Sequence, residues 1–247
     1  MKMKDNIKNK TILITGGANG IGKATALLFS ENNKVIIIDS DKKSCEELIK
    51  ENNNIDIINE DITNYEEIEK IINSIFDKYK NIDILINNAG IQTIAPISKL
   101  PLEEWNKVLK VNLTSNFYIT QIVSNKMKNN STILNISSTH YNKPRVDHAH
   151  YDISKAGIVT LTKLFAIELA NKKITVNSIA IGATYTNMNK SFEENKTEVN
   201  IARNKIPLKY ICNPEDIADS IYNVINDFSY KTTGSVFVID GGRNIAC

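Results

Sequence analysis

Short apolar runs alternate with longer amphipathic segments along the whole chain. The runs are four to eight residues long and rich in β-branched side chains, which is typical of buried strands. Between them, apolar positions recur at helical spacing and predict helices with one buried face. The expected strands are residues 11–15, 35–39, 55–59, 82–86, 132–137, 174–179 and 235–240, and the clearest helices are residues 21–31, 65–79, 102–126 and 151–170.

This alternation predicts an α/β fold of the Rossmann type, a doubly wound, mainly parallel seven-stranded sheet with helices on both faces. No Pro/Gly-rich linker, repeat or low-complexity tract divides the chain. We therefore expect residues 1–247 to form a single domain. The polar, Asn-rich stretch 184–213 is expected to be a mobile loop over a binding site, and disorder without function is the alternative.

Charge and cysteine usage narrow the class of ligand. The net charge is +2, with acidic and basic residues interspersed, so neither nucleic acid nor a membrane surface is an expected partner. The charged N-terminus lacks an apolar signal segment, and no apolar run of about 18 residues occurs. Three scattered cysteines without CxxC spacing favour a reducing compartment. We expect a cytoplasmic protein with a small-molecule ligand and no metal.

A glycine-rich turn follows the first expected strand and precedes a helix. Gly16, Gly20 and Gly22 permit a tight turn and close approach of a pyrophosphate to the backbone. The N-terminus of the following helix favours the negative charge of such a group. The sequence therefore predicts a dinucleotide-binding site, and the position of the turn is what distinguishes it from a chance glycine cluster.

Polar residues at the ends of the next strands extend this site. Asp39 ends the second strand, where a carboxylate can accept hydrogen bonds from ribose hydroxyls and repel a 2′-phosphate. This favours NAD over NADP, although Lys42 and Lys43 keep NADP open, and a helix cap or turn is the alternative for Asp39. Asp61-Ile62 follows the third strand, and the segment from residue 87 to Gly90 follows the fourth.

Tyr151 and Lys155 lie four residues apart, thirteen residues after Ser138. On a helix such a pair shares one face, so the lysine ammonium is expected to lower the pKa of the phenol from its free value of about 10. That would make Tyr151 an acid or base near neutral pH. Taken alone, the pair also fits an ordinary solvent-exposed helix face.

With these motifs in order, the chain resembles the short-chain dehydrogenase/reductase family, in its compact single-domain form, over nearly its full length. The matching residues are Thr15-Gly16-xxx-Gly20-Ile21-Gly22, Asn87-Asn88-Ala89-Gly90, Asn112, Ser138 and Tyr151-xxx-Lys155, with 206–208, 214–218 and 234–242 matching the C-terminal region.

The resemblance implies a catalytic tetrad of Asn112, Ser138, Tyr151 and Lys155. Tyr151 exchanges a proton with the substrate oxygen while hydride moves to or from the nicotinamide, and Ser138 orients that oxygen. Lys155 stabilises tyrosinate and holds the nicotinamide ribose, and Asn112 supports a water that extends the proton relay. The cofactor contacts so implied are Gly16, Asn19, Gly20, Ile21, Gly22, Asp39, Asp61, Ile62, Asn88, Gly90, Tyr151, Lys155, Thr184 and Thr186.

One position departs from the family pattern. Ile181 stands before Gly182 where the family commonly has proline. Since Ile lacks the fixed φ of proline, the start of this loop is expected to be more mobile, which weakens the assignment of Thr184 and Thr186.

All three histidines fall between Ser138 and Tyr151, in the segment that borders the substrate pocket in the resembled family. Ser138, His140, His148 and Tyr151 are therefore the expected substrate contacts, and a polyhydroxylated substrate is the leading hypothesis. Arg145 could pair with a substrate carboxylate or simply be exposed. The histidine spacing matches no common zinc pattern.

The sequence thus predicts an NAD-dependent short-chain alcohol dehydrogenase or ketone reductase acting on a secondary alcohol, such as a sugar, polyol or hydroxysteroid. The alternatives are an NADPH-dependent 3-oxoacyl thioester reductase and, from another class, a nucleotide-sensing protein without turnover. The resemblance also implies a homo-oligomer, a tetramer or a dimer.

Overall fold

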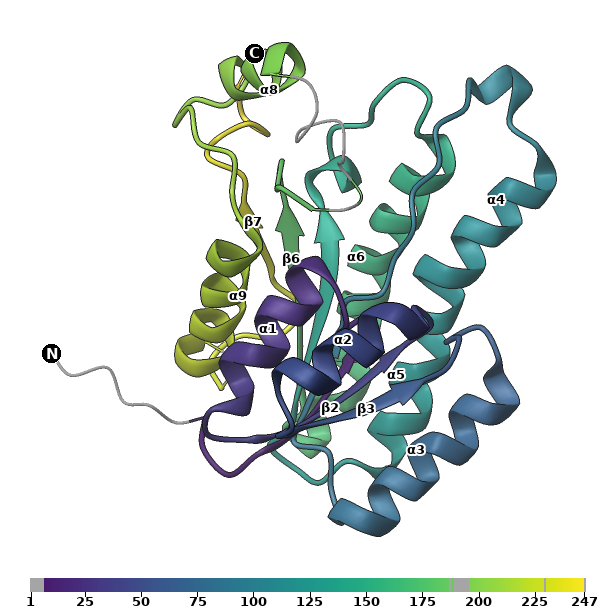
Figure 1. The fold of residues 1–247 in the computed structure, drawn as a ribbon, viewed down its shortest axis with the longest axis vertical. Helices are drawn as coiled ribbons and strands as arrows, with labels where there is room; N and C mark the ends of the chain where they lie inside the picture. The colour runs from purple at the N-terminus through teal and green to yellow at the C-terminus, as the bar shows by residue number, and fades with distance from the viewer. Residues whose placement is uncertain (1–6, 187, 189–195, 229, 247) are drawn as a thin grey trace, which may run out of the picture.

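The computed structural model describes residues 7–186, 188, 196–228 and 230–246. Strands and helices alternate along the chain and form three layers (Figure 1). The strands are β1 (Thr11–Thr15), β2 (Lys34–Asp39), β3 (Ile55–Asn59), β4 (Ile84–Asn87), β5 (Thr132–Ser138), β6 (Thr175–Ile181) and β7 (Val236–Ile239). The helices are α1 (Gly20–Ser30), α2 (Lys42–Glu51), α3 (Tyr65–Tyr79), α4 (Leu102–Leu109), α5 (Ser115–Lys126), α6 (Ala149–Leu169), α8 (Lys196–Asn204) and α9 (Pro214–Asn223).

The seven strands form one sheet in the order β3-β2-β1-β4-β5-β6-β7. Every pairing is parallel, so the predicted Rossmann-type doubly wound fold is confirmed and the sheet is parallel throughout. The strand order reverses between β1 and β4. In open α/β sheets, ligands bind outside the carboxyl ends of the strands at such a point.

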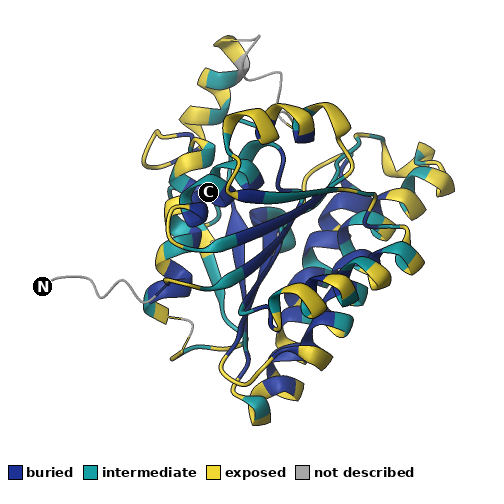
Figure 2. Ribbon diagram, turned by 60° about the horizontal axis from the view of Figure 1, so that its bottom comes forward, coloured by how far each residue is buried: buried dark blue, intermediate teal, exposed yellow. Residues whose placement is uncertain are grey.

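Alternating side chains of the strands pack into two separate hydrophobic cores, one on each face of the sheet. In β1, Ile12 and Ile14 join a cluster that includes residues of α1, α2 and α9. Leu13, between them, joins a second cluster with residues of α3, α5 and α6. Since successive side chains of a strand point to opposite faces, this division is the expected consequence of covering both faces of the sheet with helices. Figure 2 shows the buried strands in the middle and the exposed residues on the outer helix surfaces.

Three differences from the sequence-based prediction are larger than a shift of one or two residues at an element end or lie at the site. β6 continues to Ile181 and remains paired with β5 and β7 there. The expected helix 102–126 is interrupted by a π-helical turn, Lys110–Thr114, between α4 and α5. The stretch 184–213, expected as an irregular loop, contains the helix α8, and its residues 187 and 189–195 lie outside the described part.

Strand register brings the polar strand ends to one edge of the sheet. Thr15 of β1 is level with Asn87 of β4, and Ser138 of β5 is level with Ile181 of β6. The turns and helices that carry the expected site residues begin at this edge. Among the described residues, no helix combines the length and apolar character needed to cross a membrane.

Buried amides connect the layers near this edge. Asn87 Nδ2 donates to Thr120 Oγ1 of α5 and to Asn135 Oδ1 of β5, both at 2.9 Å. Asn135 Nδ2 in turn donates to Thr162 Oγ1 of α6 at 2.9 Å. All four side chains are buried, so each lost partner leaves an unsatisfied polar group.

Replacing Asn135 by alanine is expected to lower the free energy of unfolding by about 2–4 kcal/mol, because two buried hydrogen bonds are lost and a small cavity remains. Urea unfolding of the variant measures this. Asn129→Ala, at an exposed position, is the control. A cost no larger than that of the control would contradict the structural role of the network.

Candidate active site

A cavity of about 540 Å³ opens at the carboxyl edge of the sheet. It extends from the glycine-rich turn after β1 to the start of α6, so one hollow joins segments far apart in the sequence. Gly22, Asn112 and His148 are not among the residues that line it. The other expected site residues do line it: Gly16, Asn19, Gly20, Ile21, Asp39, Asp61, Ile62, Asn88, Gly90, Ser138, His140, Tyr151, Lys155, Thr184 and Thr186.

The glycine-rich turn is shaped by close contacts that leave no room for side chains. Gly16 has φ +65°, a conformation that side-chain-bearing residues rarely adopt. A Cβ built on Gly22 would lie 1.9 Å from the Gly16 carbonyl oxygen. Asn88 Nδ2 donates to the carbonyls of Thr15 (3.2 Å) and Gly16 (2.7 Å). Asn88, one of the expected cofactor contacts, therefore supports the turn from the end of β4.

Asp39 holds the same turn from the end of β2. Its Oδ2 accepts from Ala18 N at 2.9 Å, and its Oδ1 accepts from Asp41 N at 3.0 Å. Asp41, and not Asp39, is the N-cap of α2, because the Asp41 side chain accepts from the backbone N–H of Ser44 at the start of this helix. Asp39 thus presents its carboxylate to the cavity between two backbone amides.

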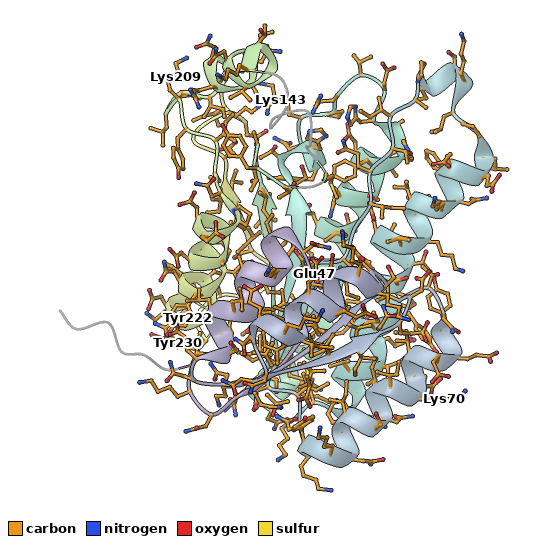
Figure 3. The ribbon with its side chains drawn as sticks, viewed as in Figure 1. Glu47, Lys70, Lys143, Lys209, Tyr222 and Tyr230 are labelled. Carbon is orange, nitrogen blue, oxygen red and sulfur yellow. The ribbon has the colours of Figure 1, made fainter. Side chains whose placement is uncertain are left out.

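The nearby lysines are directed along α2. Lys42 lies 4.0 Å from Glu46 and Lys43 lies 3.8 Å from Glu47, and neither lysine is part of the cavity wall. Glu47 is exposed on this helix (Figure 3). Both ion pairs are solvent-exposed, and Asp39 is the charged group of this segment that lines the cavity.

The loop after β6 closes the cavity from the other side. A Cβ built on Gly182 would lie 2.7 Å from Asp240 Cβ, so the loop packs closely against the end of β7. Thr184 forms an isolated bridge with Cys212, and the side chain of Thr186 lies against Gly20 of the glycine-rich turn. Both threonines line the cavity although Ile181 replaces the proline of the family pattern.

Tyr151 and Lys155 occupy the first turns of α6, and both are buried, with 7% and 4% of their surfaces exposed. Lys155 Nζ lies 5.6 Å from the centre of the Tyr151 ring and donates to the Ile136 carbonyl of β5 at 3.0 Å. The Ser138 side chain acts on the Tyr151 phenol and lowers its pKa. The three groups therefore meet where β5 ends and α6 begins.

Burial dominates the electrostatics of this pair. It raises the pKa of Tyr151 to about 12, and the hydrogen bond from Ser138 offsets only part of the rise. Burial also lowers the pKa of Lys155 to about 8. The expectation that Lys155 lowers the pKa of Tyr151 below its ordinary value is wrong for the free protein, because removing water disfavours both charged forms.

Asn112 lies in the π-helical turn between α4 and α5 and is buried. Its Oδ1 accepts from Ile91 N at 2.8 Å, while its Nδ2 donates to the Ile91 carbonyl and to Ser154 Oγ, both at 3.0 Å. A Cβ built on Gly90 would lie 3.4 Å from both Asn112 Oδ1 and Lys155 Nζ. Asn112 therefore joins the segment after β4 to α6 directly beside the lysine.

The three histidines have different surroundings. His140 lines the cavity and its Nδ1 donates to Asp152 Oδ1 at 2.6 Å. Burial, ahead of the opposing effect of Asp152, lowers the pKa of His140. His148 is buried against His140, and His150 is fully buried beside Thr93. His148, an expected substrate contact, does not line the cavity and packs against His140.

The wall also includes residues that the motifs did not indicate. Gln92 follows the Asn-Ala-Gly motif, and Arg243 comes from the C-terminal segment after β7. No local pattern marks either one, although the Gly-Gly pair before Arg243 signals a turn at this edge. In the described part of the chain, no three His, Cys, Asp or Glu side chains are grouped so as to hold a metal ion.

Comparisons with known proteins agree with this geometry. A family model described as enoyl-(acyl carrier protein) reductase matches residues 16–244. The 3-oxoacyl-(acyl-carrier-protein) reductase of Thermotoga maritima is 37% identical, over 96% of this chain and 98% of the relative. The 3β-hydroxysteroid dehydrogenase 1 of Eggerthella lenta is 31% identical, over 98% and 97% of the two chains. The chain belongs to the short-chain dehydrogenase/reductase family.

A solved structure shows the same likeness. The 3-ketoacyl-(acyl-carrier-protein) reductase of Brucella melitensis, complexed with NADH, superposes with a TM-score of 0.87 at 28% identity, over 97% of this chain and all of that one. As a short-chain dehydrogenase/reductase, the protein is an oxidoreductase that transfers hydride with a nicotinamide cofactor. The glycine-rich turn, which excludes any Cβ at Gly22, fits the pyrophosphate of such a cofactor.

Because the pKa of Lys155 is lower in the folded protein than in the unfolded chain, its contribution to the free energy of unfolding depends on pH. Between its folded value of about 8 and its ordinary value of 10.5, the unfolded chain binds more protons at this position, so its contribution to stability rises with pH. Lys155→Met should therefore be more stable than the wild type at pH 7, by up to about 3 kcal/mol. Denaturant unfolding at several pH values measures the difference.

The advantage of the variant should shrink as the pH rises from 8 toward 10.5, because Lys155 is then increasingly neutral in the folded wild type. A second variant, Lys128→Met, replaces an exposed lysine and should show no such dependence. A Lys155→Met protein that is less stable than the wild type at every pH would contradict the cost of burying this ammonium.

Proposed function

We propose that this protein is an NAD(H)-dependent dehydrogenase or reductase of a secondary alcohol or ketone, and that Asn112, Ser138, Tyr151 and Lys155 carry the reaction. One observation supports this most directly. The Ser138 and Tyr151 hydroxyls line the same cavity as the glycine-rich turn and Asp39. A dinucleotide lying from Asp39 along the turn brings its reactive end toward the two hydroxyls.

Tyr151 is the proposed acid and base. In alcohol oxidation its phenolate takes the hydroxyl proton of the substrate, and in ketone reduction its phenol returns one. Ser138 hydrogen-bonds the same substrate oxygen and fixes its position relative to the phenol. The bound nicotinamide supplies the hydride acceptor or donor at its C4.

Lys155 and Asn112 are proposed to serve this proton transfer. The buried ammonium stabilises the phenolate, and a neighbouring positive charge becomes more effective in a site that excludes water. Asn112 keeps one lone pair of Oδ1 for a water, since its other polar positions are engaged by Ile91 and Ser154. Such a water would pass the proton from Lys155 toward solvent.

NAD is the proposed cofactor, and NADP is the less favoured one. Asp39 places a carboxylate where a 2′-phosphate would lie, while Lys42 and Lys43 are paired with glutamates along α2. The Brucella melitensis relative was solved with NADH. The same carboxylate argues against the alternative, an NADPH-dependent 3-oxoacyl thioester reductase.

The substrate end of the cavity is polar, since His140 and Arg145 line it together with Ser138. This favours a sugar, polyol or similarly hydroxylated alcohol over an apolar chain. The named relatives act on 3-oxoacyl and 3β-hydroxysteroid compounds, so the reacting secondary alcohol or ketone is what they share.

We also propose a single catalytic domain in the cytoplasm that assembles into a dimer or tetramer. The outer face of α6 exposes Ile153, Leu164 and Ile167, with 47%, 51% and 76% of their surfaces accessible. Apolar side chains gathered on one helix are typical of a contact surface. Sedimentation of the purified protein tests this assembly.

Replacing Tyr151 by phenylalanine should lower kcat about 100-fold or more, because proton transfer loses its donor and acceptor. NAD affinity, measured by fluorescence titration, should change little. Tyr141→Phe, which removes a phenol outside the cavity wall, is the matched control. Near-normal turnover of Tyr151→Phe would falsify the proposed mechanism.

Replacing Asp39 by alanine should shift cofactor preference toward NADP. The change removes the charge that opposes a 2′-phosphate, and we expect the ratio of kcat/KM for NADP to that for NAD to rise about tenfold or more. Asp77→Ala, an exposed change on α3, is the control. If the wild type already prefers NADP, or the ratio does not move, Asp39 does not select the cofactor.

A further inference from the structure

A second cavity, of about 440 Å³, adjoins the substrate end of the catalytic cavity. Thr139, His140, Arg145 and Arg243 belong to both walls, so the two hollows share one boundary. Thr139 directly follows Ser138, which places this second cavity on the side of the proposed substrate oxygen. The glycine-rich turn and Asp39 are not part of its wall.

The wall of the second cavity is strongly basic. Lys143, Arg145, Lys205 and Arg243 line it, and none of its described lining residues is acidic. The whole chain has only three arginines in a nearly neutral composition, and two of them meet here. Figure 3 shows Lys143 at the same end of the molecule as α8, above the carboxyl ends of the strands.

The two arginines carry charge that the described residues leave unpaired. Neither guanidinium makes a side-chain hydrogen bond or an ion pair with another described residue. Burial and then the nearby Arg145 lower the pKa of Arg243, so the two like charges repel each other across the cavity. Bringing like charges together has a cost that a bound anion would remove.

Two carboxylates beside the arginine-bearing loops accept hydrogen bonds from other groups. Asp152 accepts from the Arg145 backbone N–H and from His140 Nδ1, both at 2.6 Å. Asp240, which favours the charged form of Arg243, accepts from the backbone N–H groups of Gly242 at 2.8 Å and Asn244 at 2.6 Å. These carboxylates position the loops that carry the arginines and form no ion pair with either guanidinium.

We propose that Arg145 and Arg243 bind an anionic group of the substrate, a carboxylate or a phosphate monoester, while its alcohol carbon lies at Ser138 and Tyr151. Guanidinium groups match the two oxygens of such anions in geometry as well as charge. This proposal rests on the proposed dehydrogenase function and names its substrate class. The substrate is a small hydroxy acid or an alcohol phosphate.

The kinetic test compares charged alcohols with neutral partners of similar shape. The pairs are 3-hydroxybutyrate with its ethyl ester, and glycerol 3-phosphate with glycerol, so the two arms separate carboxylate from phosphate. The variants are Arg145→Gln and Arg243→Gln. The matched control is Arg203→Gln, which removes the third arginine from an exposed position of α8 that lies outside both cavities.

The wild type should use the charged member of at least one pair with a kcat/KM about tenfold or more above that of its neutral partner. Each cavity variant should reduce this ratio about tenfold, because one charged hydrogen-bond partner is lost. Arg203→Gln should leave the ratio unchanged. A ratio near one in the wild type, or equal ratios in all four proteins, would overturn the proposal.

A binding measurement separates this proposal from the proposed function. Inorganic phosphate and acetate are titrated calorimetrically into each protein saturated with NAD, so that the glycine-rich turn is occupied. Wild type and Arg203→Gln should bind at least one of the two anions, and the cavity variants should bind it about fivefold or more weakly. If no alcohol is oxidised but this pattern holds, the dehydrogenase proposal fails and the anion site stands. If affinity is equal in all four proteins, the anion site fails.

Discussion

The buried pair of Tyr151 and Lys155 is the physical constraint on which the proposed chemistry depends. Water is excluded from both side chains, so each neutral form is favoured, with pKa values of about 12 and about 8 in the free protein. A phenol in this state is a poor base. Tyr151 is therefore expected to act as a base only when further positive charge, such as an oxidised nicotinamide ring, enters the same low-dielectric space.

The rest of the fold keeps these groups in place. The ammonium of Lys155 is held by a carbonyl of β5, and its helix is tied through Ser154 to Asn112 and the segment after β4. The amides of Asn87 and Asn135 connect α5, the sheet and α6. A parallel sheet brings these elements together because its strand ends share one edge. Rigid supports of this kind make a buried charge tolerable.

Much of the architecture could be predicted from sequence because it is local. β-branched runs mark strands, and helical periodicity marked α3 to the residue. The sequence did not predict the π-helical turn at Asn112, because residues 102–126 keep helical periodicity throughout. The extension of β6 to Ile181 depends on pairing with β5 and β7, which no local pattern encodes. α8 was missed because its polar sequence resembles a loop.

The site was predictable to a similar degree. Residues in ordered motifs, such as Ser138 and Tyr151, were found by position and resemblance. The direction of the Tyr151 pKa shift was not predicted. Burial depends on the assembled layers, and its effect outweighs that of a lysine four residues away. Arg243 reaches the cavity from the far end of the chain, and His148 is not part of its wall. Both outcomes depend on tertiary packing.

Titration of the Tyr151 phenol tests this account most directly. The difference in ultraviolet absorption between wild type and Tyr151→Phe isolates this residue among the nine tyrosines. We expect no tyrosinate from Tyr151 up to about pH 10.5 in the free protein, and a pKa lower by about one unit or more once NAD⁺ is bound. A phenol that ionises near pH 10 without cofactor, or whose pKa is unchanged by NAD⁺, would contradict it.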